Sequence, residues 1–255
     1  MSVAVKDPIQ RFSSRVDDYQ RYRPRYPLEV IDLLRKDCGL KPESIVADIA
    51  SGTGIFTRLL LESGNQVFAV EPNLEMRRAA ERVLSDFPNF TSVVGTAETT
   101  TLAQSSVDFV TAAQAAHWFE PGKAGREFIR ILKPGGWTVL LWNQRRTNST
   151  PFLRNYEQLL LTYGMDYRQV RHDRMGQGID QFFGRPFEAR VFENRQEFDF
   201  ESLRGRLLSS SYTPQAEDPN YTAMLETLRE LFDQHQVNGT VIMEYDTQVY
   251  YSQLA

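Results

Sequence analysis

The stretch Val46-Ala47-Asp48-Ile49-Ala50-Ser51-Gly52-Thr53-Gly54 decides how this chain folds. It joins a short apolar segment, residues 45–49, to a turn that contains two glycines, and an amphipathic helix is expected over residues 55–62. Because glycine lacks a Cβ atom, such a turn can adopt positive φ and let a ligand approach the backbone closely. A strand, a glycine turn and a helix in this order predict a crevice for a nucleoside or a nucleotide.

A second apolar segment, residues 66–70, ends in Glu71. Neighbouring parallel strands end at the same edge of a sheet, so we expect this acid to lie beside the glycine turn. There its carboxylate can accept hydrogen bonds from both hydroxyls of a ribose. The two segments together predict a nucleoside site in which Glu71 binds the sugar.

Three details narrow the choice of nucleoside. A dinucleotide fingerprint has a third small residue three positions after its second glycine, and Thr57 occupies that position here. The carboxylate of Asp48 would repel a pyrophosphate but attract an ammonium group. No Gly-Lys-Ser/Thr sequence follows the turn, which excludes a P-loop. A nucleoside with a cationic tail fits these details, and S-adenosylmethionine has a ribose, a sulfonium and an α-amino group.

The rest of the chain continues the alternation of strands and helices. Further elements are expected at residues 74–84 (helix), 90–94 (strand), 107–112 (strand), 123–132 (helix), 137–142 (strand), 151–163 (helix), 187–198 (strand), 201–209 (helix), 220–235 (helix) and 240–251 (strand). This alternation predicts a doubly wound α/β fold with a mostly parallel, seven-stranded sheet. No helix is expected after the last stretch, so we expect it to be an antiparallel strand inserted near the C-terminus.

The chain is expected to form a single domain over residues 1–255, with two additions. Residues 1–26, rich in Arg, Asp, Ser and Tyr, are interpreted as an N-terminal arm, and a helix is expected to start at Pro27 and end before Gly39. Residues 143–185 are interpreted as a lid-like insertion, and the part from residue 164 looks irregular because it is rich in Gly, Arg, Asp and Met.

Composition argues against several functional classes. The formal net charge of −4 provides no global basic field, so no nucleic acid partner is expected. With a single cysteine and three isolated histidines (Cys38, His117, His172 and His235), neither an intrachain disulfide nor a metal site is expected. No segment approaches the roughly 18 apolar residues of a membrane span. We therefore expect a cytoplasmic protein without a membrane partner; the oligomeric state is not predicted.

These motifs make the chain resemble the class I S-adenosylmethionine-dependent methyltransferases, and it is similar to the small-molecule group that includes trans-aconitate-type carboxyl methyltransferases. The resemblance covers residues 12–142 well and the remainder more loosely. Residues 48–54 match the glycine-rich first motif, and Lys133-Pro134-Gly135-Gly136 matches the turn before the fifth strand. Gly95-Thr96-Ala97-Glu98 stands where the family usually has Gly-Asp-Ala-Glu beside adenine. Because Thr96 replaces the acid, the adenine amino group is expected to bind Glu98, a backbone carbonyl or water.

The resemblance implies a set of cofactor-binding residues. They are Tyr19, Arg25, Asp48, Ala50, Ser51, Gly52, Gly54, Glu71, Pro72, Met76, Thr96, Ala97, Glu98 and Gln114. Asp48 is expected either near the amino group of the cofactor or in shaping the turn. Tyr19 and Arg25 enter because Arg23-Pro24-Arg25-Tyr26-Pro27 resembles an arm that folds over the cofactor in this group, where Arg23 and Arg25 could also contact an anionic substrate.

Candidate acceptor-side residues follow the fourth and fifth strands. His117 either acts as a general base, since imidazole titrates near neutral pH, or packs Trp118 beneath the pocket. Trp118, Trp142, Asn143, Arg146 and Tyr212 are expected on the substrate side. The pair Arg145-Arg146 either binds a carboxylate through its forked geometry or is solvated.

The expected activity is transfer of a methyl group to a small organic acceptor, such as a carboxylate. A carboxylate is already anionic and needs no base, whereas a phenol, an alcohol or an amine would give His117 a role. Three alternatives remain. They are an NAD-dependent oxidoreductase, which Asp48 and Thr57 disfavour, a non-catalytic nucleoside-binding module, and a methyltransferase acting on RNA or protein. Base N-methylation is disfavoured because Ala112-Ala113-Gln114-Ala115 stands where an Asn-Pro-Pro-Tyr-type element would be expected.

Overall fold

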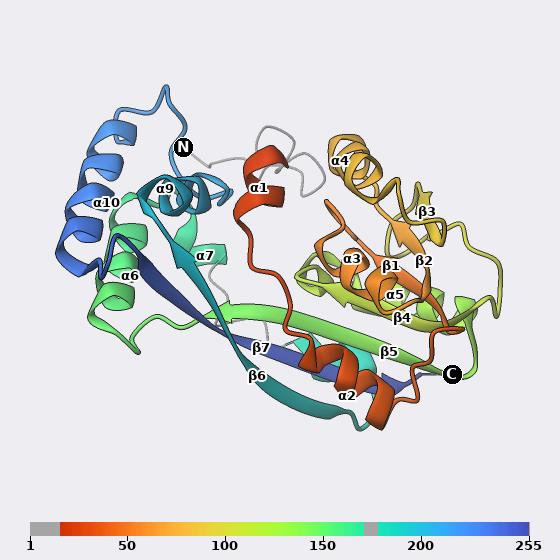
Figure 1. Ribbon diagram of the computed structural model, residues 1–255. Helices are drawn as coiled ribbons and strands as arrows, with labels where there is room; N and C mark the ends of the chain where they lie inside the picture. Colours follow the sequence, from red (N-terminus) through yellow and green to blue (C-terminus); the bar gives the residue numbers. More distant parts are fainter. Residues whose placement is uncertain (1–15, 171–177, 255) are drawn as a thin grey trace.

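The computed structural model describes residues 16–170 and 178–254 of the chain. Its strands form one sheet of seven in the order β3-β2-β1-β4-β5-β7-β6 (Figure 1). Their bounds are β1 (Ile45–Ile49), β2 (Gln66–Val70), β3 (Phe90–Val93), β4 (Val107–Ala113), β5 (Leu132–Arg145), β6 (Glu188–Phe198) and β7 (Val241–Gln253). Strand β7 pairs antiparallel with both β5 and β6, while the pairs on the other side of β5 are parallel. The predicted Rossmann-like sheet with an antiparallel C-terminal strand is therefore confirmed.

The helices of the described residues follow the expected alternation, with several short helices added to it. They are α1 (Val16–Tyr22), α2 (Glu29–Asp37), α3 (Ile55–Glu62), α4 (Leu74–Leu84), the 3-10 helix η2 (Ala116–Trp118), α5 (Pro121–Ile131), α6 (Pro151–Tyr163), α7 (Tyr167–Val170), α8 (Ile179–Phe183), α9 (Phe200–Leu208) and α10 (Tyr221–His235). Helix α1 lies in the expected arm, and α8 lies in a stretch that was expected to be irregular. Both helices are short and owe their stability mainly to tertiary contacts.

Both faces of the parallel sheet are buried, which explains the continuous apolar strands of the sequence. On one face, Val46 and Val67 pack against apolar residues of α2 and α3, such as Leu34 and Leu60. On the other face, Ala47 and its neighbours pack against α5 and α8. Adjacent residues of β1 thus belong to different cores, as the two-residue period of a strand requires.

Strand β5 is longer than the predicted strand at residues 137–142. It begins at Leu132, passes an irregularity at the Lys133–Gly136 turn where the register with β4 shifts, and continues to Arg145. The extension arises because β7 pairs with β5 as far as Tyr245, so residues 143–145 are held in the ladder. The range that was expected to form a lid-like insertion therefore begins inside the strand.

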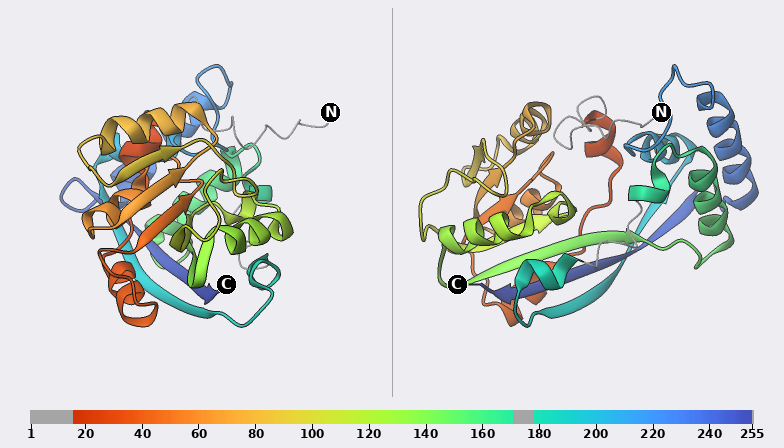
Figure 2. Two further views of the ribbon diagram at one scale, coloured as in Figure 1. Left: turned by 90° about the vertical axis from the view of Figure 1, so that its right-hand side faces the viewer. Right: turned by 180° about the vertical axis from the view of Figure 1, so that it is seen from behind.

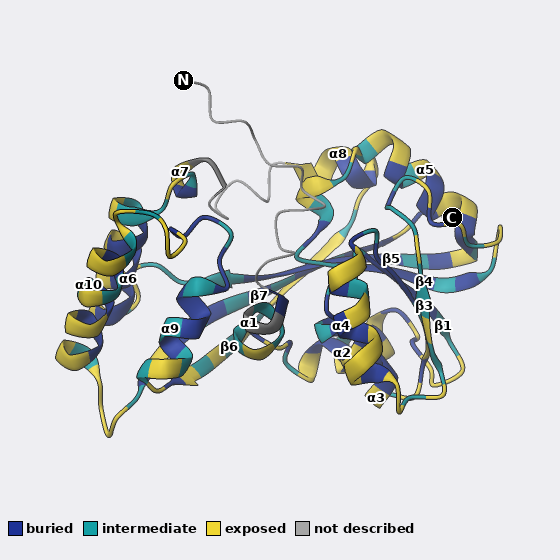
Figure 3. Cartoon of the chain, turned by 90° about the horizontal axis from the view of Figure 1, so that it is seen from above, coloured by how far each residue is buried: buried dark blue, intermediate teal, exposed yellow. Residues whose placement is uncertain are grey.

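Strands β5, β6 and β7 extend beyond the parallel core and carry a helical lobe at their far ends (Figure 2). The lobe has its own core, in which Phe152, Leu203 and Phe232 of three helices pack against Met243 and Tyr245 of β7. Its helices bury their inner faces and expose their outer ones (Figure 3). The range expected to be a lid-like insertion is thus divided, since α6 belongs to this lobe while α8 packs on α5.

Helix α1 lies between the helical lobe and α4 (Figures 1 and 3). A Cβ atom on Gly205 of α9 would lie 2.1 Å from Cε2 of Tyr22, so only glycine allows this close approach. The linker that follows α1 is also fixed, because Nδ2 of Asn143 donates to the Arg25 carbonyl at 3.2 Å and Nδ2 of Asn194 donates to it at 2.7 Å. The arm is therefore a docked part of the fold within the described residues.

Neither a bilayer-spanning helix nor a cluster of metal ligands occurs among residues 16–170 and 178–254. None of the helices there combines the length and the apolar character needed to cross a bilayer. No group of three or more His, Cys, Asp or Glu side chains in that part is arranged to hold a metal ion.

Candidate functional site

The glycine turn between β1 and α3 has the left-handed backbone that the sequence predicts. Ala50, Gly52 and Gly54 all have positive φ, at 53°, 59° and 82°. The two glycines have different roles. A Cβ atom on Gly54 would lie 2.6 Å from Cδ1 of Leu84, so this glycine permits close packing on α4, whereas a Cβ on Gly52 would meet no heavy atom within 4 Å. The turn therefore leaves open space at Gly52.

Glu71, directly after β2, points its carboxylate at this turn. Its Oε2 accepts the backbone N–H of Gly52 at 2.9 Å, and its Oε1 accepts that of Asn73 at 2.8 Å. The residue is only 7% exposed, and burial raises the pKa of its carboxyl group while the two N–H donors oppose the shift. Each carboxylate oxygen has a second lone pair, so both can accept a further hydrogen bond.

Asp48 is buried and binds hydroxyl groups of the protein itself. Its Oδ2 accepts from Oγ1 of Thr57 at 2.6 Å and its Oδ1 from Oγ1 of Thr111 at 2.9 Å. These contacts link β1 to the first turn of α3 and to β4. Of the two roles expected for Asp48, the geometry corresponds to shaping the turn, and Thr57 is its partner in that role.

The loop after β3 is held by its own polar contacts. Oγ1 of Thr96 accepts the N–H groups of Glu98 and Thr99 at 3.3 and 3.2 Å, so the threonine closes this turn as an aspartate could. The Glu98 carboxylate accepts the N–H of Glu120 at 3.0 Å and thereby joins the loop to the start of α5. Ala97 is buried in the core beneath the sheet edge.

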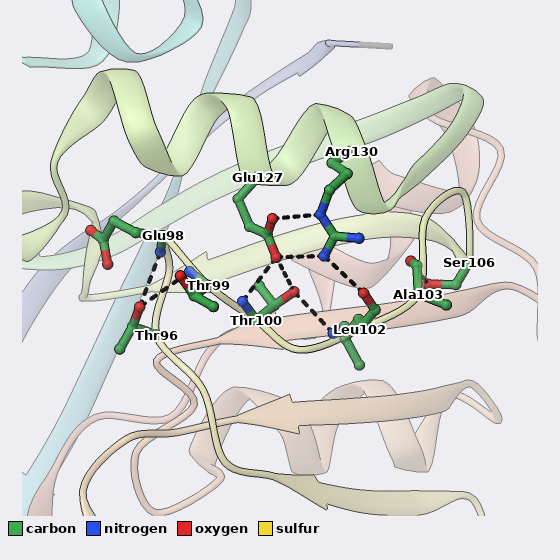
Figure 4. A network of polar contacts seen from close by, with 9 residues as sticks. All are labelled: Thr96, Glu98, Thr99, Thr100, Leu102, Ala103, Ser106, Glu127 and Arg130. Carbon is green, nitrogen blue, oxygen red and sulfur yellow. Dashed lines mark hydrogen bonds and ion pairs between the residues drawn. The ribbon is translucent and has the colours of Figure 1, made fainter.

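A second set of contacts fixes the same loop farther on (Figure 4). The Glu127 carboxylate of α5 accepts the N–H and the hydroxyl of Thr100 and both the Nε–H and an Nη2–H of Arg130. Hydrogen bonding to Arg130 lowers the pKa of Glu127 to about 2, against the opposing effect of burial. The strand end and the loop that follows it are therefore preorganised before any ligand binds.

Helix α1 brings an aromatic side chain to the cofactor side. Tyr19 packs against Met76 and Ala79 of α4. Pro72 is half-buried beside Glu71, whereas the Arg25 side chain is exposed. The structure thus brings Tyr19, Met76 and Glu71 to one region. Arg25 takes part only through its backbone carbonyl, which accepts a hydrogen bond from Asn143.

The residues after β4 divide into two groups. Gln114 has a φ of 60°, donates from Nε2 to the Asn143 carbonyl at 3.1 Å, and has a buried Oε1 without a partner among the described residues. His117 and Trp118 lie farther along, exposed and in ring contact at 4.5 Å. Trp142 is 2% exposed and packs on Tyr250 in the core. Of these residues, the structure brings Gln114 and Asn143 together and leaves the other three apart.

A cavity of about 350 Å³ lies where the linker after α1, the ends of β4 and β5, and helix α9 meet. Its walls include Gln114, Asn143 and Tyr212 from the predicted set, together with Arg23 and Arg206. It begins at the carboxyl edge of the sheet, one strand away from the glycine turn. This arrangement fits an acceptor cavity next to a nucleoside site.

The pair Arg145-Arg146 does not extend free guanidinium groups into this cavity. Nη2 of Arg145 binds the Glu157 carboxylate and the Tyr167 hydroxyl, and Nη2 of Arg146 lies 2.7 Å from Oδ1 of Asp246. Both arginines line the cavity with their charges already balanced.

Comparison with known proteins assigns a domain to this geometry. Residues 47–140 match the family model described as a methyltransferase domain. The chain is also 40% identical over 145 residues to an uncharacterised methyltransferase of Mycobacterium tuberculosis, a match that covers 57% of each protein. The chain thus matches little more than half the length of this curated relative.

Solved structures extend the likeness in fold. A protein assigned as a type II methyltransferase from Anaeromyxobacter dehalogenans aligns with a TM-score of 0.68 at 22% identity, over 91% of this chain and 98% of that one. Phosphoethanolamine N-methyltransferase 2 of Haemonchus contortus, solved with S-adenosyl-L-methionine, aligns with a TM-score of 0.57 at 16% identity, over 97% of this chain and 58% of that one. The fold is that of class I methyltransferases.

The match to a methyltransferase domain supports S-adenosylmethionine as the cofactor, and the residues present fit this group. Gly52 leaves room for a ligand, and Glu71 has a free lone pair on each oxygen for a ribose hydroxyl. The hydroxyl of Ser51, between them in the turn, is buried and has no partner among the described residues. These groups meet the needs of a ribose and of a polar amino-acid tail.

The buried carboxyl group of Asp48 predicts a pH-dependent stability. Burial raises the pKa of Asp48 from 3.8 to about 6, opposed by the hydroxyls of Thr57 and Thr111. A carboxyl group with a raised native pKa binds more protons in the native than in the unfolded state, so its contribution to stability falls as pH rises from about 4 to about 6. Asp48→Asn removes this contribution.

We therefore expect the free energy of unfolding of Asp48→Asn, relative to wild type, to rise by up to about 3 kcal/mol across that interval. Urea unfolding of the ligand-free protein at several pH values measures it. Asp32→Asn, on the exposed side of α2, is the control and should follow the wild type. A difference between Asp48→Asn and wild type that stays constant with pH contradicts the prediction.

Several cavity residues were not singled out from the sequence, among them Arg206, Gln144 and Gln248. For Arg206 a signal exists, because Leu203, Arg206 and Leu207 are spaced by three and four residues and so share the buried face of α9.

Proposed function

We propose that the protein transfers the methyl group of S-adenosylmethionine to a small organic acceptor, and that this acceptor is a carboxylic acid of the kind used by trans-aconitate-type enzymes. One observation carries the proposal. The Glu71 carboxylate is fixed against the open glycine turn, and the arginine-lined cavity begins one strand away. Ribose binding at Glu71 would place the reactive end of the cofactor toward that cavity.

The proposed cofactor site divides its tasks among several elements. Glu71 binds the ribose, Gly52 makes room for the ligand, and the hydroxyl of Ser51 meets the amino-acid tail. Ala97 and Thr96 border the adenine, while Tyr19 and Met76 cover the site from α1 and α4. Asp48 acts on the turn through Thr57 rather than on the ligand.

Bound S-adenosylmethionine supplies a methyl group on a positively charged sulfur. An oxygen lone pair of the acceptor would form the new bond to the methyl carbon as the carbon–sulfur bond breaks, and the electron pair of the broken bond would stay on sulfur. A carboxylate acceptor loses its negative charge in this step and releases no proton. The protein then contributes mainly position, which can lower the barrier by several kcal/mol. The exposed position of His117 is consistent with this, because the proposed acceptor needs no base.

Thermal unfolding with ligands tests the cofactor. We expect S-adenosylhomocysteine to raise the Tm and NAD to leave it unchanged, because binding to the native state stabilises it. Methyl transfer from labelled S-adenosylmethionine to a panel of carboxylic acids, phenols and amines then tests the reaction, and labelled methyl esters are the expected product. A Tm raised only by NAD would assign an oxidoreductase. Cofactor binding without turnover of any acceptor would assign a nucleoside-binding module.

A further inference from the structure

The acceptor cavity contains more positive charge than its neighbouring carboxylates balance. Among the described residues that line it, the arginines are Arg23, Arg145, Arg146 and Arg206. Two of them are balanced, since Arg145 pairs with Glu157 and Arg146 with Asp246. Neither of the others is within 4.0 Å of a carboxylate oxygen among the side chains that the structure describes, which in α1 do not include those of Asp17 and Asp18. Among these described side chains, two guanidinium charges therefore remain without an anion.

Arg206 is the more deeply buried of the two, at 6% exposure. Its Nη1 donates to the Ser210 hydroxyl at 3.1 Å, and its Nε approaches the Tyr245 hydroxyl at 3.4 Å. These partners are neutral. The side chain is therefore hydrogen-bonded but uncompensated in charge, on a helix face that is otherwise apolar.

Arg23 reaches the same place from the arm. Its Nη2 donates to the Ser209 carbonyl at 2.9 Å, next to the residue that binds Arg206, and its guanidinium lies 4.7 Å from the ring centre of Tyr19. Its Nε is buried and has no partner among the described residues. Burial and the neighbouring charge of Arg206 lower the pKa of Arg23, whereas the pKa of Arg206 is raised by Tyr245, Tyr156 and Tyr212 against the effect of burial.

Two unpaired guanidinium groups side by side are costly for an isolated protein, because buried charges lose hydration and repel each other. An oxyanion bound between them removes both penalties, and hydrogen bonds between ionised groups are the stronger ones. We propose that Arg23 and Arg206 form an anchoring site for an oxyanion group of the acceptor, and that the acceptor is a small acid with two negative charges. This inference rests on the proposed function and names its substrate class.

The anchored group is distinct from the atom that receives the methyl group. A carboxylate that accepts hydrogen bonds from two guanidinium groups has its charge neutralised and is a poorer nucleophile. The cavity also extends to Gln114 and Asn143, at the ends of β4 and β5, where the cofactor side begins. An acid with two functional groups can therefore bind by one end at the arginines and present the other at the edge of the sheet.

Calorimetric titration of the protein saturated with S-adenosylhomocysteine tests the site. The probes are the straight-chain dicarboxylates from malonate to adipate, butyrate as a monocarboxylate, and phosphoglycolate. We expect at least one dianion to bind tenfold or more tightly than butyrate. Arg206→Met should weaken that binding at least tenfold and Arg206→Lys less, with the affinity for S-adenosylhomocysteine unchanged. Arg23→Met should act in the same direction.

Arg204→Met is the matched control, because Arg204 is on the same helix, is exposed and pairs with Glu201. It should bind every probe as the wild type does. Circular dichroism and the retained affinity for S-adenosylhomocysteine show that a variant is folded; if Arg206→Met fails this test, Arg206→Lys and Arg23→Met decide. A preference for phosphoglycolate that is lost in the arginine variants supports the site with a phosphate as the anchored group. No preference for any dianion, or equal binding by wild type and folded arginine variants, overturns the inference and leaves the proposed function standing.

Discussion

Glu71→Ala is expected to weaken the binding of S-adenosylhomocysteine at least about tenfold, a loss of about 1.4 kcal/mol or more. The carboxylate is fixed by the Gly52 and Asn73 amides, so its remaining lone pairs are already oriented when a ribose arrives. Hydrogen bonds from hydroxyls to an ionised, mostly buried carboxylate are worth more than neutral ones. Calorimetry with the purified protein measures the change.

Two further variants identify the cause. Glu71→Gln keeps the volume and one acceptor oxygen, so we expect an affinity between those of the wild type and Glu71→Ala. Glu75→Ala, in the exposed first turn of α4, should bind as the wild type does. Urea unfolding in parallel shows whether loss of the amide contacts loosens the turn. An unchanged affinity in Glu71→Ala would remove the ribose assignment.

Gly52→Ala is expected to weaken the binding of the same ligand about tenfold or more, with a cost in stability on the order of 1–2 kcal/mol. A Cβ on Gly52 meets no heavy atom within 4 Å in the protein, so a methyl group there is tolerated sterically until a ligand comes close. The backbone φ of 59° costs an alanine on the order of 1–2 kcal/mol. The loss of affinity therefore reports the approach of the ligand to the turn.

Gly39→Ala is a control for the loss of stability caused by an alanine at positive φ. Gly39 has a φ of 72°, and a Cβ there also meets nothing within 4 Å, but it follows α2 away from the turn. Both variants should lose a similar free energy of unfolding, and only Gly52→Ala should lose affinity. If the two variants retain ligand binding equally, the open space at Gly52 does not face the cofactor.

The sheet could be predicted from the sequence because its information is local. Parallel strands that are buried on both faces are continuous apolar segments. The glycine turn marks the end of β1, and the Lys133–Gly136 turn lies near the start of β5. Helix α1 could not be predicted in this way. Its contacts are Val16 and Tyr19 on α4 and Tyr22 on Gly205, and none of these partners is near in sequence.

The cofactor half and the acceptor half of the candidate site differ, for the same reason, in how far they could be predicted from the sequence. The cofactor half consists of turns whose residue types and spacing are diagnostic. The acceptor half is assembled from distant segments, such as Arg23 and Ser209, which are 186 residues apart in the chain. Arg146 was expected either to bind an acceptor carboxylate or to be solvated, yet in the structure it is engaged by Asp246, a residue that enters only through the antiparallel strand β7.

The three long strands that join the sheet core to the helical lobe have a mechanical consequence. Strands β5, β6 and β7 pair with one another without interruption over most of their length, so bending between the two ends would break backbone hydrogen bonds rather than rotate a loop. We expect the sheet core and the helical lobe to move as one rigid body. Ligand exchange would then depend on the release of α1, which is joined to this rigid body by side-chain contacts and a single linker.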